Sequence, residues 1–139
     1  MKSIFTLAAL VGLLMAAPFN QAQNKDAKPA AASTIVKNVD INEAEKLVKE
    51  KKVTVLDIRT PKEFAAGHIA GATNINFNDA EFARKLESLD KSKSYLVHCA
   101  AGGRSGRSLE AFRKLNFQTI YHMDKGLGAW EKAGKPLEK

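Results

Sequence analysis

Strand-like segments alternate with helical patterns along most of this chain, and that alternation is the strongest constraint on its fold. The segment "VTVLDI" at 53–58 is a continuous apolar run, and "SYLVHC" at 94–99 is similar. Such runs are typical of strands covered on both faces. Further strand candidates occupy 34–40, 72–77 and 118–123. Strands that alternate with helices predict an α/β fold, with a mainly parallel central sheet of about five strands and helices on both faces.

The expected helices begin at residues that favour helix starts. Asn42 is expected to cap the first helix, and Thr60 followed by Pro61 starts the second. Asn78 or Asp79 is expected to cap the third helix. The expected ranges are 42–51, 61–67, 80–89, 104–116 and 126–134. Ligands of such sheets bind at the carboxyl ends of the strands. Two strand ends carry candidate site residues, Asp57 with Arg59 and His98 with Cys99.

The first residues have the composition of an export signal. A basic start at Lys2 precedes an apolar stretch from Ile4 to Ala17, which is too short to span a bilayer comfortably. We expect 1–22 to be a signal peptide, the polar and Ala/Pro-rich residues 23–34 to be a flexible linker, and 35–139 to be the domain. The alternative is an uncleaved anchor. We expect export, to the bacterial periplasm, with no stable membrane contact after cleavage.

The charge of the chain favours a small anionic substrate over a nucleic acid. The formal net charge is +7, and about +6 after removal of Lys2 with the signal. A basic chain suits nucleic acid, membrane surfaces or small anions. The lysines are scattered and are not interleaved with aromatic residues, so we expect no nucleic-acid partner. No long apolar stripe remains once the core is assigned, so we expect a monomer.

Cys99 is the only cysteine and therefore forms no disulfide within the chain. It is either an inert buried residue or a free thiol with a function. The loop after it consists of Ala100, Ala101, Gly102 and Gly103, which leave room for backbone N–H groups to point inward. A helix beginning near Arg104 adds its positive dipole end and a guanidinium. These features favour the thiolate and make Cys99 a candidate nucleophile.

Two other kinds of site are excluded by the residues present. The "GGRSG" segment lacks the Gly-Lys-Ser/Thr of a nucleotide-binding loop. One cysteine and three widely spaced histidines do not form a metal-ligand cluster, so we expect no metal.

Three segments resemble the rhodanese family. "DIRTPKEFAAGHIAGATNIN" at 57–76 resembles its first signature, and "CAAGGRS" at 99–105 resembles its Cys-x-x-Gly-x-Arg active-site loop. "GLGAW" at 126–130 with "AGKP" at 133–136 resembles its carboxyl-terminal signature. One position departs from the pattern, because Lys125 stands where the family has the first glycine of a pair. The departure affects the local turn rather than the chemistry.

The resemblance implies a sulfurtransferase. Cys99 would attack the outer sulfur of a donor such as thiosulfate, and a thiophilic acceptor, cyanide or a thiol, would remove the sulfur from the persulfide. The N–H groups of residues 100–104 would stabilise the persulfide, and no metal or organic cofactor is needed. Cys99 and Arg104 are thus the expected catalytic residues, and loop residues 100–103 are expected to bind substrate.

Other functions remain open at this point. A sulfur carrier would form the same persulfide, and a partner-binding module would not need Cys99. Related phosphatases and arsenate reductases have a Cys-x5-Arg loop, whereas Arg104 makes this loop Cys-x4-Arg. The smaller loop suits a sulfur atom better than a phosphate.

Residues near the loop have expected supporting roles. Asp57 and Arg59 are expected to form an ion pair that holds the pocket wall, and Arg59 is also a candidate contact for an anionic donor. Ser105 is expected to support the loop. His98 precedes Cys99 on a strand, so its side chain is expected on the opposite face in a structural role.

Overall fold

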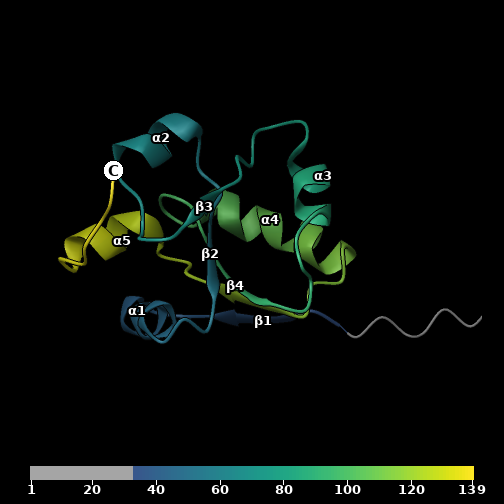
Figure 1. The fold of residues 1–139 in the computed structure, drawn as a ribbon, viewed down its shortest axis with the longest axis horizontal. Helices are drawn as coiled ribbons and strands as arrows, with labels where there is room; N and C mark the ends of the chain where they lie inside the picture. Colours follow the sequence, from purple (N-terminus) through teal and green to yellow (C-terminus); the bar gives the residue numbers. More distant parts are fainter. Residues whose placement is uncertain (1–32) are drawn as a thin grey trace, which may run out of the picture. The chain divides into compact units, whose positions relative to one another are not determined.

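Five strands form one parallel sheet in the computed structural model, which describes residues 33–139 (Figure 1). The elements are β1 (Ile35–Asn38), α1 (Ile41–Lys49), β2 (Thr54–Asp57), α2 (Pro61–Ala66), β3 (Thr73–Asn74), α3 (Phe82–Glu87), β4 (Ser94–His98), α4 (Gly103–Lys114), β5 (Thr119–His122) and α5 (Gly126–Lys132). The strand order is β1-β5-β4-β2-β3, and every pairing is parallel. The predicted α/β fold is confirmed. The expected signal peptide and nearly all of the expected linker lie outside the described residues.

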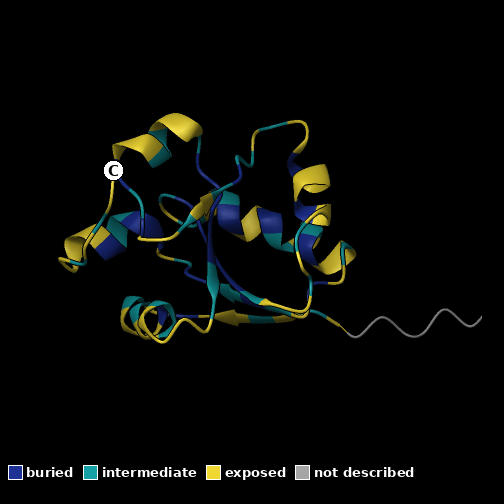
Figure 2. Ribbon diagram, in the orientation of Figure 1, coloured by how far each residue is buried: buried dark blue, intermediate teal, exposed yellow. Residues whose placement is uncertain are grey.

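Each face of the sheet is covered by helices, as Figure 1 shows. On one face, Leu56, Val97 and Ile120 of the strands pack with Phe82 of α3 and Phe112 of α4. The other face buries a second cluster that includes α1 and α5, and its members are Val39, Ala44, Val55, Ile69, Leu96, Met123, Leu127 and Trp130. Buried residues accordingly line the sheet and the inward sides of the helices, while the outward sides are exposed (Figure 2). Alternation along β4 therefore places consecutive residues on opposite faces of the sheet.

The helix starts differ from the expected ones in two places. Asp40 rather than Asn42 caps α1, because its Oδ1 accepts a hydrogen bond of 2.8 Å from the Glu43 amide. The third helix begins only at Phe82, where no side chain caps it. The Asp79 carboxylate accepts instead from the Glu81 amide at 2.9 Å and forms a turn ahead of the helix. Asp and Asn side chains favour such local turns as readily as helix caps.

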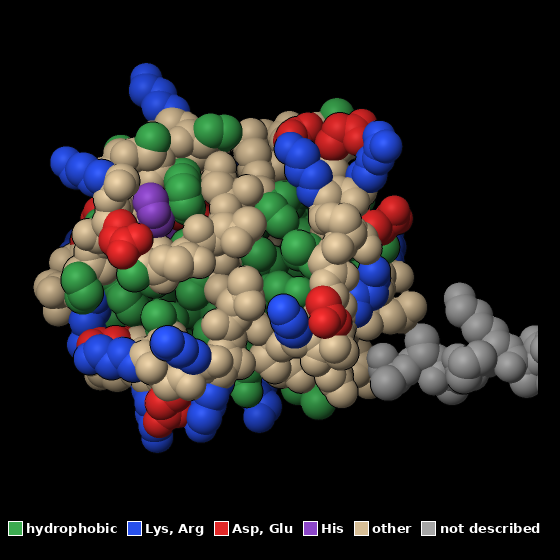
Figure 3. All heavy atoms as spheres, viewed as in Figure 1, with side chains coloured by type: hydrophobic (Ala, Val, Ile, Leu, Met, Phe, Trp, Pro, Cys, Tyr) green, Lys and Arg blue, Asp and Glu red, His purple; other side chains and the backbone are tan. Residues whose placement is uncertain are grey.

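The surface is mixed in charge. On the face shown in Figure 3, Lys and Arg side chains lie mostly toward the periphery, with Asp and Glu side chains among them. Within residues 33–139, no helix has the length and hydrophobicity needed to cross a bilayer.

Candidate active site

The candidate site lies at the carboxyl edge of the sheet, where three neighbouring strands end. Asp57 of β2 is in register with His98 of β4, and Val97 of β4 is in register with His122 of β5. Cys99 follows β4 directly. The parallel arrangement thus brings residues that are far apart in the sequence to one edge, as expected for α/β proteins.

The loop after β4 wraps around the Cys99 sulfur. The Gly102 amide lies 3.1 Å from Sγ and the Ser105 amide 3.4 Å, and both donate to it. The Ser105 hydroxyl oxygen lies 3.5 Å from the same sulfur. Gly103, the first residue of α4, and Ala101 are exposed, whereas Cys99 itself is 1% exposed. The thiol therefore lies at the floor of the loop, surrounded by polar donors.

These hydrogen-bond donors favour the ionised form of the Cys99 thiol. Burial opposes loss of the proton, but the hydrogen bonds from Ser105, Ala101 and Gly102 outweigh it, and the pKa of Cys99 lies below its ordinary value. A lowered pKa increases the thiolate fraction near neutral pH, and the thiolate is the nucleophilic form. The geometry is therefore that of an activated cysteine.

The start of α5 fixes the loop from the other side. The Leu127 amide donates to the Cys99 carbonyl at 2.9 Å, and the Gly128 amide donates to the Ala100 carbonyl at 3.0 Å. Gly126 has a φ of 68°, and a Cβ there would overlap the Ala100 carbonyl. Lys125 has a φ of −82°, which any residue adopts, so the lysine in place of a family glycine leaves the turn intact.

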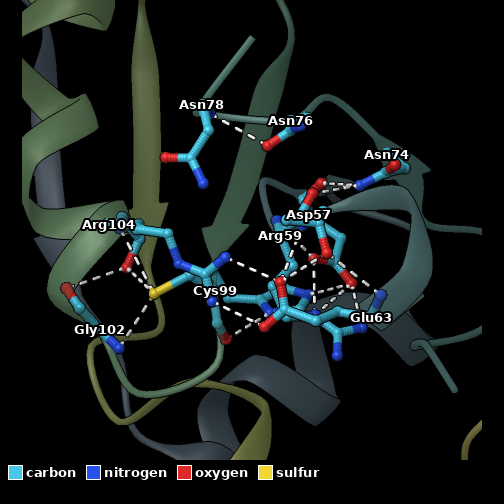
Figure 4. A network of polar contacts seen from close by, with 12 residues as sticks. Asp57, Arg59, Glu63, Asn74, Asn76, Asn78, Cys99, Gly102 and Arg104 are labelled. Carbon is cyan, nitrogen blue, oxygen red and sulfur yellow. Dashed lines mark hydrogen bonds and ion pairs between the residues drawn. The ribbon is translucent and has the colours of Figure 1, made fainter. Parts of the chain in front are cut away.

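Arg104 forms an ion pair with Glu63, as Figure 4 shows. Its Nη1 donates to Glu63 Oε2 at 2.8 Å and its Nη2 donates to Oε1 at 2.9 Å. Glu63 is placed by α2, where Thr60 and Glu63 form a reciprocal capping box. The guanidinium expected beside Cys99 is thus paired with a carboxylate. The direct stabilisers of the sulfur are hydrogen-bond donors.

Because of this ion pair, the free energy of unfolding is expected to fall as the pH is lowered through the acid range. Arg104 holds the pKa of Glu63 at about 2, against an ordinary 4.5, with help from Thr60. The contribution of the pair is therefore complete above about pH 4.5 and is lost as the pH falls toward 2. The Glu63→Gln variant is expected to be less stable than the parent at neutral pH, and the difference should shrink toward pH 2. Urea unfolding over this pH range measures it.

The matched control for that variant is Glu87→Gln, which makes the same change at an exposed position of α3. Its free energy of unfolding should stay parallel to that of the parent at every pH. A difference for Glu63→Gln that persisted unchanged at pH 2 would contradict the assignment.

Asp57 and Arg59 form a buried, bidentate ion pair at the end of β2. Arg59 Nη2 donates to Asp57 Oδ2 at 2.6 Å and Nε donates to Oδ1 at 2.9 Å. Nη2 also donates to the Gly67 carbonyl at 2.7 Å, and the Asn74 side-chain Nδ2 donates to the Arg59 carbonyl at 2.8 Å. This geometry favours a role in holding the wall of the site. A contact between Arg59 and a donor anion stays a prediction.

His98 is buried and points away from the thiol. Its Nδ1 lies 3.1 Å from the Cys99 carbonyl oxygen, and its Nε2 lies 3.8 Å from Asp57 Oδ2. Burial lowers the pKa of His98, although the Asp57 charge acts in the opposite direction. The ring is thus a neutral structural group beside the ion pair.

Two residues that no sequence motif indicates also reach the site. His122 Nε2 lies 2.7 Å from the Ser105 hydroxyl oxygen, and His122 Nδ1 lies 3.1 Å from Asn38 Oδ1. Both residues end their strands, and Asn38 and His122 are in register. The expectation that ligands gather at strand ends would have identified His122 once β5 was placed beside β4.

Among residues 33–139, no group of three or more His, Cys, Asp or Glu is arranged to hold a metal ion.

A lone activated cysteine, in a glycine-containing loop between a parallel strand and a helix, defines a class of α/β proteins with a cysteine nucleophile. The rhodanese-like domain model matches residues 40–133, and the chain belongs to that family.

Individual relatives agree with this assignment. The chain is 27% identical over 146 residues to "Rhodanese-like domain-containing protein 14, chloroplastic" of Arabidopsis thaliana, with 74% of this chain and 65% of that protein covered. It therefore spans less than two thirds of that relative. It is 26% identical over 101 residues to "Thiosulfate sulfurtransferase GlpE" of Vibrio cholerae, with 73% of this chain and 93% of the relative covered.

Solved structures share the fold. A rhodanese-related protein from Thermoplasma volcanium superposes with a TM-score of 0.66 at 29% identity, covering 73% of this chain and 97% of that one. The relatives named as sulfurtransferases support a sulfurtransferase kind of activity.

Proposed function

We propose that this protein transfers a sulfane sulfur from thiosulfate to a thiophilic acceptor, cyanide or a thiol, through a persulfide on Cys99. The observation that carries the proposal is the set of donors around Cys99 Sγ, with amide nitrogens at 3.1 and 3.4 Å. Such donors favour a thiolate before attack and a persulfide anion after it. Membership of the rhodanese-like domain family supports the same chemistry.

Two displacements complete the reaction. The Cys99 thiolate attacks the outer sulfur of thiosulfate, an S–S bond forms to the cysteine, and sulfite leaves with the electron pair of the broken S–S bond. The outer sulfur of the persulfide now carries the negative charge. Cyanide then attacks that sulfur, thiocyanate leaves, and the Cys99 thiolate is restored. Neither step requires a redox cofactor or a metal.

The Glu63–Arg104 pair favours sulfur chemistry over phosphate chemistry. A phosphate or arsenate ion is held by a free guanidinium that binds its oxygens in a fork. Here both terminal nitrogens of Arg104 already donate to Glu63. The Cys-x4-Arg loop is also one residue shorter than the Cys-x5-Arg loop of the related phosphatases. Export to the bacterial periplasm and a monomeric state complete the proposal. The amino-terminal composition supports export, and the lack of a long apolar stripe once the core is assigned supports a monomer.

The intact mass of the full chain, before and after exposure to thiosulfate, tests this proposal. We expect a gain equal to one sulfur atom, and cyanide should remove it with formation of thiocyanate. Multiple turnover with thiosulfate and cyanide would identify an enzyme, whereas a single loading that only a thiol removes would favour a carrier. The absence of any gain would overturn thiosulfate as the donor.

A further inference from the structure

A continuous series of hydrogen-bonding groups connects Cys99 to the edge strand β1. The Cys99 sulfur lies 3.5 Å from the Ser105 hydroxyl oxygen, which lies 2.7 Å from His122 Nε2. His122 Nδ1 lies 3.1 Å from the Asn38 side-chain oxygen. Cys99, Ser105 and His122 are all buried. We call these four residues the relay.

The direction of each hydrogen bond follows from counting protons. The Asn38 side-chain oxygen accepts only, so His122 Nδ1 carries a proton. A neutral imidazole has one proton, so Nε2 accepts. The Ser105 hydroxyl lies 2.7 Å from Nε2 and 3.2 Å from the Gly102 carbonyl oxygen, and we assign its proton to the shorter contact, with Nε2. The Ser105 oxygen then has a lone pair left for the Cys99 S–H. In the thiol state every group therefore donates in one direction, from Cys99 toward His122.

We propose that His122 takes up the proton of the Cys99 thiol through the Ser105 hydroxyl and so prepares the nucleophile. The S–H proton moves to the Ser105 oxygen as the Ser105 proton moves to His122 Nε2. The products are a Cys99 thiolate that accepts from Ser105, and a His122 imidazolium whose Nδ1 still donates to Asn38. The proton count and the total charge are unchanged. His122 acts through Ser105 and is a positioning residue.

The surroundings of His122 keep its ring neutral at rest and include one charge that favours its protonation. Burial lowers the pKa of His122, whereas the Asp124 charge acts to raise it. The ring is therefore neutral at rest and able to accept. The other elements packed against it contribute uncharged groups: the Asn38 amide from β1, and Ser105 and Gly106 from α4, where a Cβ on Gly106 would lie 4.0 Å from His122 Cε1. The thiolate and Asp124 both favour the imidazolium once it forms.

The rate of alkylation of Cys99 by iodoacetamide, measured across pH in the full chain, tests the relay. Because Cys99 is the only cysteine, alkylation reports on this thiol alone. The His122→Gln variant keeps an amide that can bond to Ser105 but cannot take up a proton. We expect its rate profile to move to higher pH, and alkylation at neutral pH to slow about tenfold if the thiol pKa rises by about one. At high pH the rate should return to that of the parent.

Two comparisons separate a relay from a structural effect. His68→Gln makes the same change at a histidine that stacks on Phe64, and it should leave the profile in place. Ser105→Ala should move the profile in the same direction as His122→Gln, and the double variant should move it little further, because both changes interrupt one path. A His122→Gln profile that coincided with the parent, or fell equally at every pH, would overturn the proposal.

The inference rests on Cys99 being the nucleophile of the proposed function, but the experiment does not use a sulfur donor. Failure to load sulfur from thiosulfate with a displaced His122→Gln profile would overturn the donor and keep the relay. Sulfur loading from thiosulfate, with a His122→Gln profile that coincides with that of the parent, would keep the donor and overturn the relay.

Discussion

The Cys99→Ser variant is expected to accept no sulfur from thiosulfate and to show no turnover above background. A serine hydroxyl in the same position does not ionise near neutral pH and does not form a persulfide. The loop donors from Gly102 and Ser105 would still find an oxygen of similar size in place of the sulfur. We therefore expect the fold to be retained and the loss to be complete. Intact mass after exposure to thiosulfate and a thiocyanate assay measure the two effects.

A thermal unfolding curve is the control for that variant, because a midpoint close to that of the parent shows that the loss is chemical. Sulfur uptake by Cys99→Ser would mean that the sulfur is carried elsewhere, and it would contradict the assignment of the loop. Retained binding to a partner, with sulfur transfer lost, would add a docking role to the same domain.

The Gly102→Ala variant is expected to be much less stable than the parent. Gly102 has a φ of 97°, in the left-handed region that an L-residue adopts at a cost of about 1–2 kcal/mol. A Cβ at this position would also overlap the Asp124 carbonyl oxygen. Relief of such an overlap costs about 1–3 kcal/mol more. The sum is a large part of the roughly 5–15 kcal/mol that stabilises a typical domain.

Activity should fall with stability in this variant, since the Gly102 amide donates directly to Cys99 Sγ at 3.1 Å. The matched control is Gly103→Ala at the next residue, where a Cβ would meet nothing within 4 Å. Its free energy of unfolding should change by about 0.5 kcal/mol or less. Urea unfolding of both variants makes the comparison. Equal losses in the two variants would show that the close approach of Asp124 is not what requires a glycine.

The sheet and the position of Cys99 after β4 were predictable because their signals are local. Apolar runs such as "VTVLDI" at 53–58 and the cysteine with its small-residue loop are contiguous in the sequence. Helix boundaries were less predictable, because Asp79 satisfies a turn amide as readily as a helix cap. The strand expected at 72–77 is shorter in the structure, where β3 comprises only Thr73–Asn74.

The partners of the site residues required the tertiary structure. Glu63 is 41 positions from Arg104, and Asn38 is 84 positions from His122. The residues around Arg104 and around His122 in the sequence do not specify which distant side chain will contact them. Only the order of the strands brings β1 beside β5 and β5 beside β4. Such separations explain why local patterns indicate neither the Glu63 partner of Arg104 nor the contact of His122 with Ser105.

The strand order also has a consequence for biosynthesis. β1 is the first of the five strands to leave the ribosome, and in the described sheet it pairs only with β5, which is the last. A nascent chain therefore cannot complete its sheet until Thr119–His122 has emerged, and until then β1 is an unpaired edge. Domains generally fold as units during synthesis. For this chain, Cys99 and His122 therefore come together only after β5 has been made.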